Sequence, residues 1–178
     1  MTAVRWAVVL SDDLDALERL ALRALWDAAF AGRFSDDDEV HAFGGVHVIA
    51  RDGLGRPVVH ASAVPRRLRV GDVWWEAGYV EAVAVAPEHQ HEGLGTIAME
   101  LLGDQIAGRF PFAMLSTGSH GFYTRLGWQR WQGRSFTLDA DGRCRPDDEH
   151  GGLLVLPLDS GIDPSLDVTC EDRSGDAW

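Results

Sequence analysis

The chain has 178 residues, and its 28 acidic and 16 basic side chains give a formal net charge of −12. A chain this negative repels phosphate backbones and anionic lipid, which argues against nucleic acid and membrane surfaces as partners and favours a cationic partner. The hydrophobic content of 46% argues against disorder,. This length predicts one domain over residues 1–178.

The cysteine and histidine content gives no sign of a metal site or a disulfide framework. The two cysteines, Cys144 and Cys170, lack the spacing of either, and the seven histidines are scattered,. The first apolar run, Val4 to Leu10, is interrupted by Arg5 and lacks the features of a leader peptide,. No apolar stretch approaches the ~20 residues of a membrane span. We therefore expect a cytoplasmic protein without a metal.

The first third of the chain predicts a strand followed by two helices. Val4 to Leu10 has strand character, and Ser11 before two aspartates is typical of a helix N-cap,. The helix that follows, which ends near Gly32, has an apolar stripe at three- and four-residue spacing. Its members are Leu14, Leu17, Ala21, Leu22, Leu25, Ala28 and Ala29. Ser35 predicts the start of a second helix, which runs through the acids to Glu39.

Strands dominate the middle of the chain. Residues 46–51 and 57–70 predict two strands joined by a hairpin at 52–55, and the turn at Gly71-Asp72 leads into a third strand, 73–85,. Pro87 ends that strand.

Helices and short strands alternate in the remainder. We expect helices at 93–107 and 120–126, and strands at 112–116, 128–131, 135–138 and 153–156,. The whole pattern predicts an α+β fold with a mixed, mostly antiparallel sheet flanked by helices.

The junction between residues 79–85 and the helix at 93–107 favours an anion site. Gln90-His91-Glu92-Gly93-Leu94-Gly95 lies between a strand and a helix N-terminus. Free backbone N–H groups there bind pyrophosphate, and glycine lets the anion approach closely. A plain helix start would show the same residues, so the motif alone leaves both readings open.

A second motif gives this junction a family context. The pattern Gln90, Gly93, Gly95 resembles the Arg/Gln-x-x-Gly-x-Gly/Ala signature of the acetyl-CoA-dependent N-acetyltransferases (GNAT superfamily). Gly121 to Trp128, an aromatic pair followed by Leu-Gly-aromatic, resembles the second signature of that superfamily. The resemblance implies the GNAT fold and acetyl-CoA as cosubstrate.

A closer resemblance spans nearly the whole chain. Four segments are similar to the aminoglycoside 2'-N-acetyltransferases, namely residues 30–35, 41–48, 78–81 and 170–178. The resemblance implies acetylation of the 2'-amine of a polycationic aminoglycoside, by direct transfer in a ternary complex, and hence antibiotic resistance.

Glu81 and Tyr123 are the candidate catalytic residues. Glu81 is the only charge on the apolar strand around it, which favours a base that accepts the ammonium proton, although a structural carboxylate fits the same pattern. By period two it would share a face with Tyr79 and Val83. For Tyr123, only its place in the second signature implies the role of an acid for the departing thiolate.

The resemblance also implies how acetyl-CoA is held. The Val83 N–H would face the acetyl carbonyl, and Ala84 and Val85 would pair with the pantetheine arm like an added strand. The phosphates would lie on the loop formed by Gln90, His91, Glu92, Gly93, Leu94 and Gly95.

A polycationic substrate predicts a pocket rich in carboxylates. The candidate substrate-binding residues are Asp38, Glu81, Asp147, Asp148, Asp176 and the α-carboxylate of Trp178, with Ser116 as a neutral partner. Arg33 departs from the family pattern, in which we expect an acid between Gly32 and Phe34.

Other readings remain open at this stage. A GNAT enzyme that acetylates another small polyamine or a protein amine, and a CoA-binding module without catalysis, fit the same motifs. The sequence also leaves both a monomer and a homodimer open.

Overall fold

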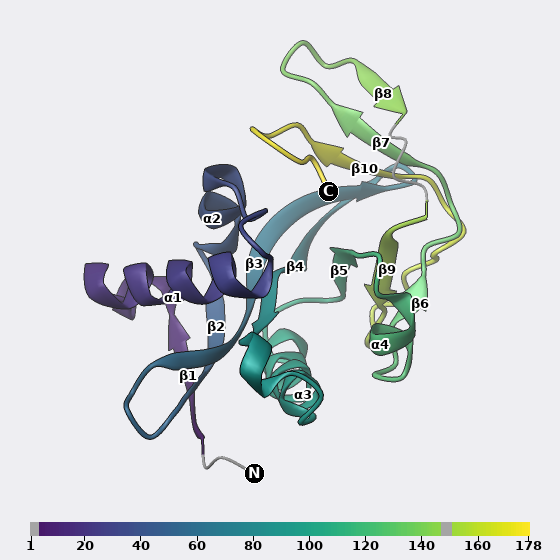
Figure 1. Ribbon diagram of the computed structural model, residues 1–178. Helices are drawn as coiled ribbons and strands as arrows, with labels where there is room; N and C mark the ends of the chain where they lie inside the picture. Colours follow the sequence, from purple (N-terminus) through teal and green to yellow (C-terminus); the bar gives the residue numbers. More distant parts are fainter. Residues whose placement is uncertain (1–3, 147–150) are drawn as a thin grey trace. The chain divides into compact units, whose positions relative to one another are not determined.

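The computed structural model describes residues 4–146 and 151–178 (Figure 1). The chain forms two compact units. Unit 1 comprises residues 1–64 and 80–105, and unit 2 comprises residues 65–79 and 106–178. Two long strands, β3 (Pro57–Val70) and β4 (Val73–Val85), contribute residues to both units.

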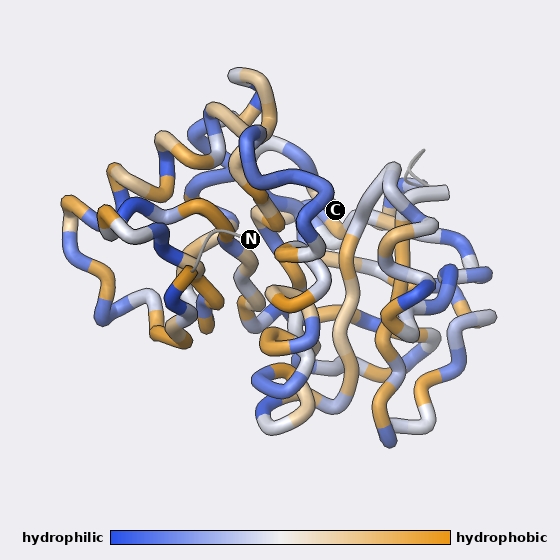
Figure 2. The backbone as a smooth tube through the Cα atoms, turned by 60° about the horizontal axis from the view of Figure 1, so that its bottom comes forward, coloured by the Kyte–Doolittle hydropathy of each residue, from blue (hydrophilic) through white to orange (hydrophobic). Residues whose placement is uncertain are grey.

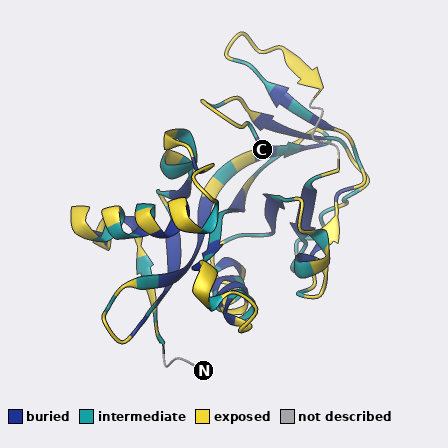
Figure 3. Cartoon of the chain, viewed as in Figure 1, coloured by how far each residue is buried: buried dark blue, intermediate teal, exposed yellow. Residues whose placement is uncertain are grey.

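Unit 1 is built on an antiparallel arrangement of β1 (Arg5–Leu10), β2 (Val46–Arg51) and the first part of β3. Val48 lies opposite Val8 on one side and Ala61 on the other. β2 and the neighbouring part of β3 are buried along most of their length (Figure 3). This double burial explains their nearly continuous apolar sequence.

Helix α1 (Ala16–Ala29) covers one face of this sheet (Figure 1). Its Leu22, Leu25 and Trp26 are buried; the predicted stripe included the two leucines but not Trp26, and its Leu17 is 76% exposed,. Outside the core, Arg51 of β2 forms an ion pair with Glu18 of the helix at 2.8 Å. The helix is therefore fixed to the sheet by both packing and charge.

The start of α1 differs from the prediction. Ser11 begins a short 3-10 turn (Ser11–Asp13), and the N-cap of the helix is Asp15, which forms a capping box with Glu18. Ser11 is buried, and its hydroxyl is used in contacts with residues far along the chain. Ser11 is drawn into the interior and does not cap the helix, which its local sequence does not reveal,.

Two more helices complete unit 1. α2 (Asp36–Ala42) begins after Ser35, as predicted, and α3 (Leu94–Ala107) follows β4, with only its last two residues in unit 2. Between β4 and α3 lies a 3-10 turn, Pro87–His89. The buried face of α3 includes Ala98, Met99 and Leu102.

Unit 2 holds the shorter strands. They are β5 (Ala113–Ser116), β6 (Gln129–Arg130), β7 (Ser135–Leu138), β8 (Cys144–Pro146), β9 (Leu153–Leu156) and β10 (Val168–Glu171), with the helix α4 (His120–Thr124) between β5 and β6. β4 pairs in parallel with β5, and β9 is antiparallel to both β5 and β6. β10 is antiparallel to β3 and parallel to β7, which pairs antiparallel with β8.

The predicted α+β class with a mixed, mostly antiparallel sheet is confirmed. The bounds of β2, β3, β4, β7 and β9 are those predicted. The prediction missed β8 and β10. β8 has three residues, too few to show a period, and β10 has four and is defined by its pairing with the distant strands β3 and β7,. The prediction of a single domain stays a prediction.

Within residues 4–146 and 151–178, no helix is long and apolar enough to cross a membrane. In the same part of the chain, no group of three histidine, cysteine or acidic side chains could hold a metal ion.

Candidate active site

The loop from β4 to α3 has the backbone geometry of an anion site. His91 and Gly93 both have positive φ, 67° and 81°, immediately before α3 begins at Leu94. A Cβ added at Gly93 would meet no atom within 4 Å, so this side of the loop is open. Successive turns of this kind direct backbone N–H groups into one concavity, next to the positive end of the helix dipole. The residues present therefore fit a pyrophosphate.

Side chains hold this loop in place. The Gln90 amide donates to the carbonyl oxygen of Val85 at 3.2 Å, and His89 lies 3.7 Å from the Glu92 carboxylate. The end of β4 is fixed to β3 by a hydrogen bond from the Ala86 N–H to the Val58 carbonyl oxygen at 2.9 Å. All predicted cofactor-binding residues, 83–85 and 90–95, thus lie in unit 1 on one strand end and the turn after it.

Glu81 lies in β4 next to an irregular backbone. Ala82 has φ of 51°, a left-handed conformation that an alanine in a strand rarely adopts,. The strict alternation on which the prediction of a shared face for Glu81 and Val83 depends is interrupted at such a residue. Glu81 is half-buried, and its carbonyl oxygen accepts a hydrogen bond from Ser62 Oγ at 3.1 Å.

The carbonyl oxygen of Ala82 meets a buried histidine. His60 Nδ1 lies 2.7 Å from it, and His60 Nε2 lies 2.9 Å from His47 Nδ1. His47 Nε2 lies 2.7 Å from the hydroxyl of Ser11. We call these three side chains the Ser-His-His chain. Both histidines are fully buried.

Both histidines are neutral at ordinary pH. Burial lowers the pKa of His60 to about 3, with a smaller effect from neighbouring His47. Burial also lowers the pKa of His47 to about 4, helped by the positive charge of Arg19.

In unit 2, three predicted substrate-binding residues come together. Ser116, Asp176 and Trp178 line one pocket of about 460 Å³ with His120 and Arg130. Asp176 is exposed, whereas Trp178 is buried. The Arg130 guanidinium lies 3.2 Å from His120 Nδ1, which leaves the proton of a neutral His120 on Nε2,. The pocket thus combines a carboxylate, a hydroxyl, an imidazole and a guanidinium.

Arginine side chains fix the C-terminal segment that brings Asp176 and Trp178 to this pocket. Arg66 donates to the carbonyl oxygen of Ala177, and its guanidinium also faces the Trp178 ring at 5.6 Å. Arg173 donates to the carbonyl oxygen of Asp176 at 2.9 Å. The segment itself is hydrophilic (Figure 2), so these contacts rather than apolar burial hold most of it,.

Tyr123 lies in α4 of unit 2 and is buried against aromatic rings. Phe122 and Trp128 meet it edge to face, with ring centroids 4.8 and 6.1 Å away. Burial raises the pKa of Tyr123 to about 12. Its phenol is therefore protonated throughout the physiological range, as a general acid requires.

Asp38, another predicted substrate-binding residue, takes part in capping a helix. The Asp38 carboxylate accepts a hydrogen bond from the Ser35 N–H at 2.7 Å as part of the α2 capping box, and it belongs to unit 1. Asp147 and Asp148 lie outside the described residues. Nearby Asp36 is bound to Arg23 at 2.9 Å, and Arg33 is exposed.

Sequence reasoning missed the Ser-His-His chain and the role of Arg66. The predicted hairpin at 52–55 contained the signal for the first, because its register places His47 opposite Ser62 and Ile49 opposite His60. Nothing local predicts the second, since Arg66 and Ala177 are more than a hundred residues apart in sequence.

Comparison with known proteins agrees with this geometry. Residues 15–131 match the family described as "Acetyltransferase (GNAT) domain". The chain belongs to the GNAT acetyltransferases and is an acyl-transferring enzyme.

The chain is similar to several known acetyltransferases. The chain is 37% identical over 177 residues to the aminoglycoside 2'-N-acetyltransferase of Mycolicibacterium fortuitum, and the match covers 96% of this chain and 90% of that protein. It is similar in fold to YhbS, a GNAT family N-acetyltransferase of Escherichia coli solved in complex with CoA, with a TM-score of 0.68, 16% identity, and 97% and 95% of the two chains covered. The chain is also similar in fold to a GNAT family acetyltransferase of Brucella melitensis solved in complex with acetyl-CoA. The TM-score is 0.63 and the sequence identity 16%, and the match covers 92% of this chain and 94% of that one.

Proposed function

We propose that this protein transfers the acetyl group of acetyl-CoA to the 2'-amine of an aminoglycoside, and so confers resistance to such antibiotics. The observation that carries the proposal is the pocket of unit 2. It presents Asp176, Trp178 and Ser116 together, in a chain that is 37% identical to an aminoglycoside 2'-N-acetyltransferase.

Acetyl-CoA would be held by the residues of the β4–α3 junction. The N–H groups of residues 91–95 would bind the pyrophosphate, and the open side of Gly93 gives it room,. Ala84 and Val85 would pair with the pantetheine arm, and the Val83 N–H would donate to the acetyl carbonyl oxygen. This backbone binding is needed because the net charge of −12 opposes an anionic cosubstrate,.

The reaction removes two protons from the acceptor nitrogen and supplies one to the departing sulfur, so one proton is released overall. Glu81 accepts a proton from the substrate ammonium, directly or through water, and the free amine attacks the thioester carbon. The carbon–sulfur bond breaks, the thiolate takes a proton from the Tyr123 phenol, and the second proton of the attacking nitrogen returns to the phenolate. The products are the amide and CoA.

The acceptor is held by charge. Asp176 attracts an ammonium group of the aminoglycoside, while Ser116 and His120 offer hydrogen bonds to its hydroxyl groups,. Asp38, Asp147, Asp148 and the Trp178 carboxylate remain predicted contacts of the same substrate.

The test is CoA-thiol release with a panel of aminoglycosides that do and do not carry a 2'-amine. We expect turnover only with those that carry it, loss of turnover in Glu81→Gln and Tyr123→Phe, and unchanged acetyl-CoA binding in both variants. Equal rates with and without the 2'-amine would refute the regiochemistry. Wild-type rates in both variants would refute the assigned roles.

A further inference from the structure

We propose that the Ser-His-His chain is a positioning device for acetyl transfer, which holds the left-handed backbone at Ala82 and thereby the placement of Glu81 and Val83. The inference rests on the proposed function for its catalytic consequence, but the geometry that carries it lies entirely within unit 1.

The backbone at Ala82 is strained. A left-handed backbone costs a non-glycine residue about 1 kcal/mol or more, so it persists only where surrounding contacts enforce it. Here two successive carbonyl groups of β4 are bound by side chains of β3. Ser62 Oγ donates to the Glu81 oxygen, and His60 lies against the Ala82 oxygen at 3.1 and 2.7 Å respectively.

The contacts of the Ser-His-His chain indicate which ring nitrogens carry protons. A neutral His60 has one ring proton, and at 2.7 Å from a carbonyl oxygen a bare Nδ1 lone pair would be repelled, so Nδ1 carries the proton,. His60 Nε2 then accepts from His47 Nδ1, and His47 Nε2 accepts from the Ser11 hydroxyl. The Ser11 hydroxyl has a second acceptor within reach, the Gly45 carbonyl oxygen at 3.2 Å, but its contact with His47 at 2.7 Å is the shorter.

Trp26 offers the competing arrangement. Its indole N–H lies 3.2 Å from the same His60 Nδ1, which would have to be unprotonated to accept it. The contact to the Ala82 oxygen is shorter, and the reversed arrangement would place a lone pair against that oxygen. The ring proton of His60 therefore lies on Nδ1 and is donated to the Ala82 oxygen of β4.

Backbone N–H groups fix the Ser11 end of the Ser-His-His chain. Ser11 Oγ accepts from the N–H groups of Gly44 and Gly45 at 2.8 and 3.0 Å. A Cβ at Gly45 would lie 2.0 Å from the Ala63 oxygen, so this backbone is locked against β3. The Ser-His-His chain thus connects a fixed backbone at Ser11 to the strained backbone at Ala82, so we assign it a supporting role in addition to core packing.

Positioning, not chemistry, is the role that follows. Neither imidazole touches the reacting atoms, but a shift at Ala82 would move the Glu81 carboxylate and the Val83 N–H, which act on opposite partners of the reaction. Small displacements of such groups cost about a hundredfold in rate.

The experiment compares three variants of the full chain. His60→Leu removes the donor, and His60→Asn places an amide N–H where Nδ1 was. Ile49→Ala removes packing from the position opposite His60, on β2, a strand that does not pair with β4. We expect His60→Leu to lower kcat by about 30-fold or more with little change in the KM for acetyl-CoA, His60→Asn to restore most of kcat, and Ile49→Ala to keep it.

Two readouts need no acceptor and separate this inference from the proposed function. Amide exchange at residues 81–83 should accelerate in His60→Leu and not in Ile49→Ala, and ¹⁵N spectra of the wild type should place the proton of both histidines on Nδ1. If the wild type shows these signatures but acetylates no aminoglycoside, only the proposed function fails. Unchanged exchange in a folded His60→Leu variant, or a proton on His60 Nε2, overturns the positioning role. If His60→Leu does not fold, His60→Asn and Ser62→Ala carry the same comparison.

Discussion

The guanidinium carbon of Arg66 lies 4.6 Å from the centre of the Tyr79 ring, so an arginine of β3 stacks on a tyrosine of β4 within unit 2. The same side chain donates to the Ala177 carbonyl oxygen. Arg66 therefore joins the C-terminal segment to the strands, and the placement of Asp176 and Trp178 depends on it.

Replacement of Arg66 should loosen the acceptor pocket. We expect Arg66→Ala to raise the KM for an aminoglycoside about tenfold, equal to a loss of about 1.4 kcal/mol, and to accelerate amide exchange in residues 172–178. Arg67→Ala is the matched control, because Arg67 lies on the same strand and its ion pair with Glu171 is exposed,. Similar effects of the two variants would contradict the role of Arg66.

The buried histidines predict how stability depends on pH. Their pKa values in the folded protein, about 4 for His47 and about 3 for His60, lie below the 6.5 of the unfolded chain. Between these values the unfolded chain binds more protons, so stability is complete above about pH 6.5 and is lost as the pH falls. For His47 alone the loss is about 2 kcal/mol from about pH 7 to about pH 5.

Urea unfolding over that pH range checks this expectation. His47→Gln should remove part of the pH dependence, whereas His91→Gln, which changes an exposed histidine, should retain it. A pH-independent free energy of unfolding in the wild type would mean that the histidines are not buried in neutral form.

Tyr123 should titrate separately from an ordinary tyrosine. The chain has two tyrosines, so Tyr79→Phe leaves Tyr123 as the only phenol. Burial raises its pKa to about 12, and the phenolate absorbance of this variant should have its midpoint there. After denaturation the midpoint should return to about 10. A native midpoint near 10, with the circular dichroism unchanged, would show that Tyr123 is solvated.

The two candidate caps of α1 should differ in their effect on stability. Asp15→Ala removes an exposed capping box and should cost about 1 kcal/mol, while Asp15→Asn should be nearly neutral,. Ser11→Ala leaves the N–H groups of Gly44 and Gly45 without their buried acceptor and should cost about 2 to 3 kcal/mol,. Chemical denaturation measures both. Equal costs would contradict the assignment of the cap to Asp15.

The features of this fold that depend on local sequence could be predicted, whereas those that depend on contacts between distant segments could not. The long strands β3 and β4 and the α2 cap at Ser35 were predicted because period, turn and cap signals are local. Strand β10 was missed because its pairing with β3 and β7 joins segments that are far apart in sequence. Ser11 was misplaced for the same reason.

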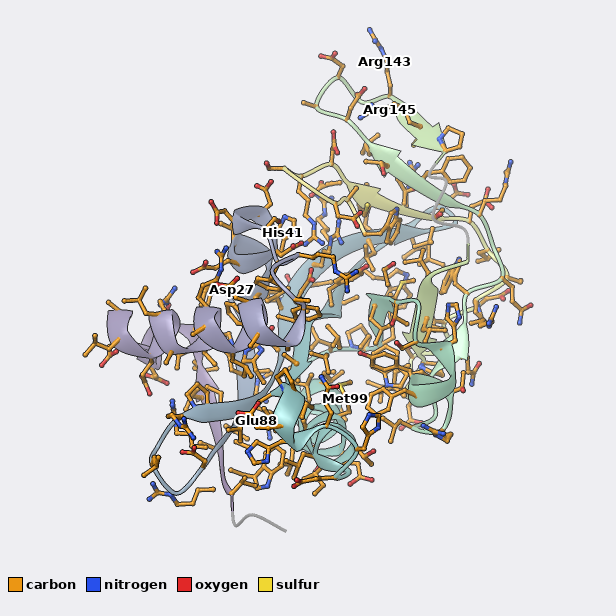
Figure 4. All side chains as sticks on the ribbon, viewed as in Figure 1. Asp27, His41, Glu88, Met99, Arg143 and Arg145 are labelled. Carbon is orange, nitrogen blue, oxygen red and sulfur yellow. The ribbon has the colours of Figure 1, made fainter. Side chains whose placement is uncertain are left out.

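The acidic C-terminal part of the chain shows a similar limit. The sequence predicts that Asp147, Asp148, Asp176 and the Trp178 carboxylate of this part bind the substrate, whereas other acids in it have partners in the fold. Asp167 binds Arg134 at 2.7 Å, and Asp172 binds Arg145 at 3.1 Å. Figure 4 shows Arg143 and Arg145 on the hairpin of β7 and β8. Of the residues in the described part of unit 2 whose carboxylates were predicted to bind the substrate, Asp176 and Trp178 both line the pocket.

The ion pairs and stacking contacts described above share one chemical property. All 16 basic residues of the chain are arginine, so Arg23, Arg66 and Arg134 hold their partners with guanidinium groups. A guanidinium stays protonated at the alkaline pH at which an amine substrate becomes nucleophilic, and it is not acylated by a thioester. An enzyme that binds a reactive acyl donor thus carries no lysine side chain that the donor could modify, and its structural cations are inert to its own chemistry.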